Sequence, residues 1–141
     1  MTEKEFWKKI QKGLGKLIDT AKGRMDRVEN GVCDGMPDVS LTSGSIDVWV
    51  ELKYVAKWPS RANTRLLGDR GLRPEQINWH LRHTRAGGKS FVLVGVGREM
   101  YLADGSQAKE INGWTFQDWM KNSRCVENFE DLYVKLFTKF V

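Results

Sequence analysis

The most regular alternation of hydrophobic and polar positions in the chain lies between Ser45 and Tyr54. Every second residue from Ile46 to Leu52 is aliphatic, whereas the residues between them are charged or aromatic. A period of two predicts a β-strand with one face toward a core and the other face free to carry chemistry. The dipeptide Ser43-Gly44 predicts a turn, so this strand forms a hairpin with a strand from Pro37 to Thr42.

Apolar positions spaced by three or four residues predict the helices. Such a stripe predicts a helix over residues 4–22, with a capping box formed by Thr2 and Glu5 at its start. A proline suits a first helical position, which predicts a second helix from Pro74 to about Arg85. A helical tail is expected over residues 115–141, and its last piece is expected to pack on the sheet or on a second subunit.

Three further strands are predicted around the hairpin and the second helix. A short strand from Met25 to Asn30 precedes the hairpin, a continuous apolar strand runs from Ser90 to Val96, and another runs from Glu99 to Ala103. This order of elements predicts an α/β fold, with a mixed sheet of about five strands flanked by helices. We expect a single domain over residues 1–141, with its core at about 25–105.

The composition is that of an ordinary globular domain. The chain has 141 residues, of which 40% are hydrophobic and 29% are charged. No apolar run is long enough to cross a bilayer, and the first residues lack the layout of a secretory signal, so no membrane partner is expected. Cys33 and Cys125 are the only cysteines, which predicts no disulfide framework and a cytoplasmic location.

The positive charge is concentrated in one segment. The whole chain carries +5, but the segment from Lys53 to Lys89 has nine basic residues against two acidic ones and carries +7. Much of it falls in a long loop expected over residues 55–72. Such a local excess is expected of a surface that binds a phosphate backbone, although a solvated basic loop is the simpler alternative. The candidate DNA-binding residues are Lys57, Arg61, Arg65, Arg70, Arg73 and Arg82.

The hairpin brings together residues that suit metal-assisted hydrolysis. Asp38 is expected beside Glu51 across the two strands, and Lys53 shares the face of Glu51. Two adjacent carboxylates repel unless a cation lies between them, and oxygen ligands favour Mg²⁺. The carbonyl of Leu52 could add a ligand, and the lysine could position or deprotonate an attacking water. The alternative is an ordinary polar strand face at the surface.

Pro37-Asp38 followed by Glu51-Leu52-Lys53 resembles the motif of the PD-(D/E)xK nucleases. The wider sequence resembles the virus-type replication–repair nuclease (VRR-NUC) domain, in its short phage and bacterial forms. The similar pieces, in order, are Arg27–Gly31, Gly35–Val39, Val50–Lys53, Leu72–Trp79 and Ala86–Val94, which span about residues 25–105. The resemblance implies a fold like that of restriction endonucleases and archaeal Holliday-junction resolvases. It also implies a homodimeric, metal-dependent endonuclease that acts on branched DNA.

The resemblance assigns roles to four residues of this chain. Asp38 and Glu51 correspond to metal ligands and Lys53 to the catalytic lysine. Gln76 corresponds to a glutamine that points from the following helix toward the active centre. His80 and His83 lie on that same helix; we interpret them as surface or phosphate-facing side chains, with a general base as the alternative.

One further acidic residue is expected at the metal. Many relatives place a metal-supporting glutamate on the N-terminal helix, where Glu3 and Glu5 are the only early acidic residues. Glu29 stands nearer in sequence to Asp38, in the predicted strand. We favour Glu29, with Glu5 as the alternative; an ion pair with a nearby arginine would explain Glu29 without any catalytic role.

The leading hypothesis is therefore a Mg²⁺-dependent endodeoxyribonuclease, in which Mn²⁺ would substitute. It would act on branched DNA in the manner of a junction resolvase, as a homodimer in phage replication, recombination or repair. A nicking, flap or restriction-type nuclease of the same fold is one alternative. A catalytically silent DNA-binding module is another, although a module that only binds gains nothing from adjacent carboxylates that face phosphates.

Overall fold

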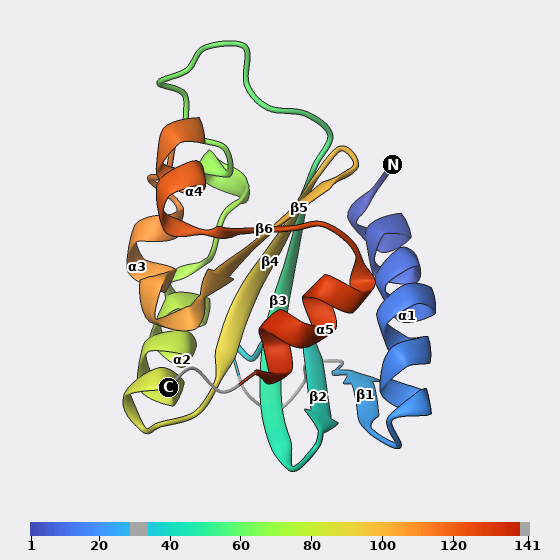
Figure 1. The fold of residues 1–141 in the computed structure, drawn as a ribbon. Coiled ribbons are helices and arrows are strands. Elements are labelled where there is room, and N and C mark those ends of the chain that lie inside the picture. The colour runs from blue at the N-terminus through green and yellow to red at the C-terminus, as the bar shows by residue number, and fades with distance from the viewer. Residues whose placement is uncertain (29–33, 139–141) are drawn as a thin grey trace.

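Six strands form one mixed sheet in the computed structural model, which describes residues 1–28 and 34–138 (Figure 1). The strands lie in the sheet in the same order as in the chain, and of the five pairs only β3–β4 is parallel. They are β1 (Arg24–Arg27), β2 (Val39–Ser43), β3 (Ile46–Val55), β4 (Ser90–Val96), β5 (Glu99–Asp104) and β6 (Arg124–Val126).

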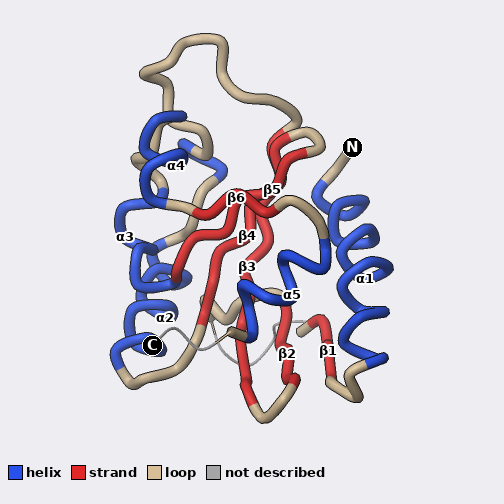
Figure 2. Tube along the Cα trace, in the orientation of Figure 1, coloured by secondary structure: helices blue, strands red, loops and turns tan. Residues whose placement is uncertain are grey.

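Helices cover both faces of this sheet (Figures 1 and 2). One face is covered by α1 (Glu3–Thr20) and α5 (Phe129–Phe137). The other is covered by α2 (Pro74–Arg85), α3 (Ala108–Ile111) and α4 (Phe116–Asn122). Two single 3₁₀ turns, η1 (Gly68–Arg70) and η2 (Gly105–Gln107), join these elements. None of the described helices is long and apolar enough to cross a membrane.

Each helix layer closes its own hydrophobic core against the sheet. Leu14 of α1 and Leu132 of α5 pack with Val50 of β3, and all three are at most 3% exposed. On the opposite face, Val92 of β4 and Trp119 of α4 are fully buried in a second core. Burial of a large apolar side chain contributes about 1.5–3 kcal/mol, so these two cores fix the sheet between the helix layers.

The predicted hairpin, the two long helices and the two strands that follow them are confirmed within a few residues of their predicted ends. The expected count of about five strands is corrected to six, because β6 pairs with β5 along Met100–Leu102. Its three residues are too few to show an alternating pattern. The last helix packs on the sheet, which was one of its two predicted positions. Residues 29–30 of the predicted first strand lie outside the described residues.

Gly35 sets the path of the chain just before Asp38. Its φ of +85° is in the left-handed region, and a Cβ atom there would overlap the backbone carbonyl of Glu75 in the first turn of α2. Only glycine satisfies both conditions. This close approach fixes the segment that leads into β2 against the start of α2.

Gly35→Ala is therefore expected to lower the free energy of unfolding by about 2 kcal/mol or more, because it adds a backbone overlap to the strain of a positive φ. Gly44→Ala is the matched control, since Gly44 also has a positive φ (57°) but has no atom within 4 Å of a built Cβ. Urea unfolding followed by circular dichroism measures both. Equal losses in the two variants would contradict the packing role of Gly35.

Candidate functional site

The candidate site lies where β2 stops short of the end of β3. The pairing of β2 with β3 ends at Val50, whereas β3 stays paired with β4 as far as Val55. The segment between these residues therefore has an open edge on the β2 side. At this edge the Leu52 N–H donates to Asp38 Oδ2 at 2.9 Å. Because the N–H and C=O of one residue point to the same side of a strand, the Leu52 carbonyl faces this edge too.

Glu51 projects from this segment into an almost closed environment, with 2% of the residue exposed. Its Oε1 accepts a hydrogen bond from Gln76 Nε2 at 2.7 Å and lies 3.8 Å from Lys53 Nζ. Its Oε2 is buried and has no hydrogen-bond partner among the described residues. One carboxylate oxygen is therefore held by the protein, and the other is available to a ligand.

Burial is the main reason that the pKa of Glu51 is raised from 4.5 to about 8. The negative charge of Asp38 raises this pKa further, and the ammonium of Lys53 opposes the rise. A hydrogen bond that the protonated carboxyl of Glu51 can share with Asp38 raises the pKa again, and Glu3 adds a smaller increase. The raised pKa means that the surroundings of Glu51 and Asp38 supply too little positive charge to stabilise both carboxylates in the ionised form. A proton or a cation between the two would supply it.

The start of α2 places Gln76 over Glu51. Pro74 occupies the first helical turn, and the N–H of Arg73 donates to Gln76 Oε1 at 2.9 Å. The side-chain amide is thereby oriented, because its oxygen is bound to the backbone and its nitrogen points to the carboxylate. With 7% exposure, Gln76 is buried between α2 and the sheet. Gln76, predicted to point toward the active centre, has its amide directed at Glu51 in the structure.

The donors at this edge fit a divalent cation. They are the unpartnered oxygen of Glu51, the neighbouring carboxylate of Asp38 and the carbonyl of Leu52. The described residues contain no ready-made group of three or more His, Cys, Asp or Glu side chains around one point. A site with two carboxylates suits Mg²⁺, which takes one or two carboxylates and retains several water molecules.

Glu5, the alternative for the additional acidic residue, has a structural role. Its backbone N–H donates to Thr2 Oγ1 at 3.2 Å, and its carboxylate accepts from the Thr2 N–H at 3.3 Å. This is the capping box that the sequence predicts. Glu29, which was favoured from sequence, lies outside the described residues, so its role at the metal stays a prediction.

Glu3 is the acidic residue of α1 that interacts electrostatically with Asp38 and Lys53. It lies at an exposed rim, where partial burial raises the pKa of its carboxyl, Lys53 lowers it and Asp38 raises it again. Glu3 is one of the two early acidic residues of the predicted helix, but Glu29 and Glu5 were the residues expected at the metal. The signal was present, because Glu3 lies about one helical turn before Trp7 and so continues the apolar stripe that faces the sheet.

The six predicted DNA-binding side chains are all exposed, but they do not form one surface. Lys57, Arg61, Arg65 and Arg70 lie in the segment between β3 and α2, which Figure 1 shows as a long excursion at one end of the sheet. Arg73 directly precedes α2. Arg82 lies farther along that helix, where it lines a separate hollow with Asn78 and Arg85. The six residues are therefore divided between two regions of the surface.

The long segment is fixed to the body of the protein at both ends. Trp58 donates its indole N–H to Glu99 Oε1 at 3.0 Å and packs edge-on against Phe116 of α4. Near α2, the N–H of Leu72 donates to Asn112 Oδ1 at 2.7 Å, and Asn112 Nδ2 donates back to the Leu72 carbonyl at 2.8 Å. The exposed arginines between these contacts therefore lie on a loop that is anchored at both ends, residues 58–72, which we call the arch.

His80 is not the surface residue that was expected. It is fully buried, and its Nδ1 lies 2.7 Å from the hydroxyl of Ser90 on β4. Burial lowers the pKa of His80 to about 4, so its ring is neutral near pH 7. His83 is half-buried and stacks on Trp79 with ring centroids 4.6 Å apart. His80 thus joins α2 to the sheet one helical turn beyond Gln76.

No protein-family model and no curated protein matches the sequence, but solved structures match the fold. The Holliday junction resolvase Hjc of the archaeal hyperthermophile Archaeoglobus fulgidus superposes with a TM-score of 0.50 and 16% sequence identity, over 74% of this chain and 78% of that one. A VRR-NUC domain superposes with a TM-score of 0.46 and 21% identity, over 70% of this chain and 89% of that one. The likeness to Hjc confirms the predicted α/β fold of restriction-endonuclease type. At 16% identity, the likeness establishes the fold alone.

Replacing Glu51 by Gln is expected to stabilise the metal-free protein, and to do so more at pH 8 than at pH 5. A carboxyl whose folded-state pKa lies above its unfolded value contributes stability below about pH 4.5, and this contribution is lost as the pH rises toward 8. The amide retains an acceptor for Gln76 and carries no charge. The expected gain at pH 8 is on the order of 3 kcal/mol, measured by thermal unfolding in a chelator.

Glu110→Gln is the matched control for this experiment, because Glu110 is an exposed residue of α3 and its substitution removes the same charge. A Glu51→Gln variant that is less stable than the parent at both pH values would contradict the electrostatic account of the site.

Proposed function

We propose that this protein is a metal-dependent endonuclease that hydrolyses phosphodiester bonds in DNA. The observation that carries the proposal is the buried Glu51 carboxylate beside Asp38, with one oxygen lacking a partner among the described residues. Without a cation at this position, Glu51 would either hold a proton near neutral pH or be charged beside Asp38 with only Lys53 to offset the two carboxylates. The fold, which is similar to that of a Holliday junction resolvase, agrees with this reading.

The donors Asp38, Glu51 and the Leu52 carbonyl would hold Mg²⁺ or Mn²⁺, which when bound supplies Lewis acidity toward the phosphate and lowers the pKa of water. Lys53 has a distinct part. Its side chain is 15% exposed and its Nζ lies 3.8 Å from Glu51 Oε1, so the ammonium can face both the carboxylate and an incoming phosphate. There it would orient the attacking water and stabilise the negative charge that develops on the phosphate oxygens.

Gln76 and Glu3 would act around this centre. Gln76 holds Glu51 in one rotamer through its hydrogen bond, which keeps the second oxygen of that carboxylate directed to the cation. Glu3 is the carboxylate of α1 with electrostatic reach to Asp38 and Lys53, and it would add a further negative charge, directly or through water. Glu29 remains the other candidate for that role.

The DNA is proposed to be branched, and the enzyme is proposed to act as a homodimer in phage replication, recombination or repair. The anchored arch of exposed arginines supports a nucleic-acid substrate, because it presents positive charge beyond the carboxyl end of β3. Symmetric cutting of a four-way junction needs two active sites on opposed strands, which a two-fold dimer provides.

The dimer predicts a solution mass of about twice the 16.2 kDa of the chain. Light scattering coupled to gel filtration measures this mass, with and without a four-way junction. A mass of one chain in both conditions would contradict the paired-site arrangement.

The reaction predicts cutting that requires both a divalent cation and Lys53. Purified protein is incubated with Mg²⁺ or Mn²⁺ and end-labelled four-way junction, flap, single-stranded and linear duplex DNA. Lys53→Ala is expected to lower the cutting rate by about 10²–10³-fold, as removal of a group that stabilises developing charge does. Lys16→Ala removes the same charge from the exposed side of α1 and is expected to cut like the parent.

The distribution of products separates the alternatives. Symmetric nicks in the junction support a resolvase, whereas preferred cutting of a flap or of one duplex strand supports a flap or nicking nuclease. Binding of DNA without metal-dependent cutting of any substrate would leave only the silent binding module, and the endonuclease proposal would be wrong.

A further inference from the structure

A groove between α1 and β1 opens directly onto the candidate site. Its volume is about 680 Å³, and the residues that matter here are Glu3, Lys4, Trp7, Lys8, Arg27 and Asp38; we call it the α1 groove. Asp38 and Glu3, at one end, belong to the surroundings of the candidate cation. Lys4 and Lys8 line the groove from α1, and Arg27 lines it from β1.

The floor of the groove orients one of these basic residues. Trp7 is 9% exposed, and the guanidinium of Arg27 lies 5.3 Å above the centre of its ring. A cation–π contact of this kind uses the face of the guanidinium and not its N–H groups, which stay available to other acceptors. In the described part of the chain, no carboxylate forms an ion pair with Arg27, Lys4 or Lys8.

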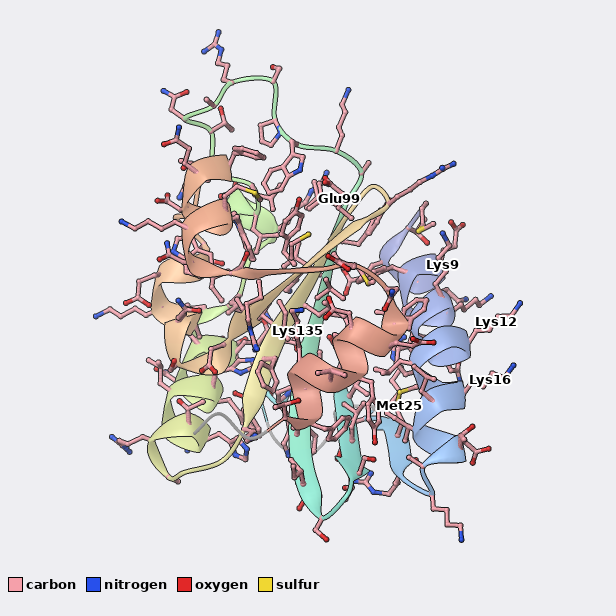
Figure 3. The ribbon with its side chains drawn as sticks, in the orientation of Figure 1. Lys9, Lys12, Lys16, Met25, Glu99 and Lys135 are labelled. Carbon is pink, nitrogen blue, oxygen red and sulfur yellow. The ribbon has the colours of Figure 1, made fainter. Side chains whose placement is uncertain are left out.

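The spacing of the two lysines suits a repeating negative charge. Lys4 and Lys8 are one helical turn apart, or about 6 Å along the axis. Successive nucleotides of one strand rise by about 3.4 Å, so the two lysines span about two phosphates. The other lysines of α1 have a different position: Figure 3 shows Lys9, Lys12 and Lys16 projecting from the outer side of the helix.

We infer that the α1 groove binds the backbone phosphates that flank the scissile phosphate on one side. The arch between β3 and α2 would hold DNA on the other side, since it is anchored on β5 and α4 at the opposite part of the sheet. The inference rests on the proposed function and adds to it a second track of phosphate contacts. The candidate site then lies between two basic surfaces, and the strand to be cut runs from the groove, across Asp38 and Glu51, to the arch.

The test compares two double variants of one helix. Lys4→Gln with Lys8→Gln removes two charges that line the groove; Lys9→Gln with Lys12→Gln removes two from the outer side of α1. Both are made in Lys53→Ala, so that DNA is bound without being cut. Binding to a fluorescein-labelled duplex is followed by anisotropy over a series of salt concentrations. The groove variant is expected to bind on the order of tenfold more weakly, with a salt slope shallower by about 2. The outer variant is expected to keep the slope of the parent.

A second measurement locates the contact on the DNA. Uncharged methylphosphonate linkages are placed on one side or the other of the mapped cut. On the groove side they are expected to weaken binding by the Lys53→Ala parent but to add no further loss in the groove variant, since the same contact is already absent. On the arch side they are expected to weaken both proteins equally.

The outcomes distinguish this inference from the function on which it rests. Equal salt slopes for the two double variants, in proteins that bind DNA and melt at the temperature of the parent, would overturn the groove and leave the nuclease intact. Additive losses with the groove-side methylphosphonates would overturn it as well. Failure of the parent itself to bind any DNA would instead overturn the proposed function.

Discussion

The burial of one ionisable carboxylate, that of Glu51, is the constraint on which the rest of the site depends. A charged group taken out of water is costly unless it is paired and hydrogen-bonded. The described residues supply one ammonium, from Lys53, against two adjacent carboxylates, and Glu3 adds a third nearby. Burial is the main cause of the raised pKa of Glu51, and this imbalance of charge adds to it. A divalent cation would correct both the missing charge and the missing partner of Oε2.

The fold produces this imbalance at one place because β2 is shorter than β3. The edge beyond Val50 leaves the Leu52 carbonyl without a partner strand on the β2 side and lets the side chain of Asp38 bind the strand where a backbone partner would otherwise lie. Helices from the two faces of the sheet then meet at that edge. α2 contributes Gln76, whose position follows from the proline and the cap at its start, and α1 contributes Glu3.

What the sequence could predict is local. Asp38 and Glu51 are neighbours because a short turn and a period of two fix the register of the hairpin. Burial of Glu51 could not be predicted, because Gln76, which covers it, comes from a helix 25 residues later. His80 was missed for the same reason: its partner, Ser90, belongs to the next strand. Glu3 could have been selected from the sequence, because the predicted capping box already gave Glu5 a structural role at the start of the helix.

The most direct test of the central claim is a crystal structure of the protein with Mn²⁺, using the anomalous scattering of the ion. We expect one peak at the edge of β3, bound by oxygens of Asp38 and Glu51 at roughly 2.0–2.2 Å, close to the distances of Mg²⁺ sites. In a crystal of Glu51→Gln the peak should weaken or disappear. No peak at this edge at saturating Mn²⁺, with Glu51 bound only to Gln76, would contradict the account.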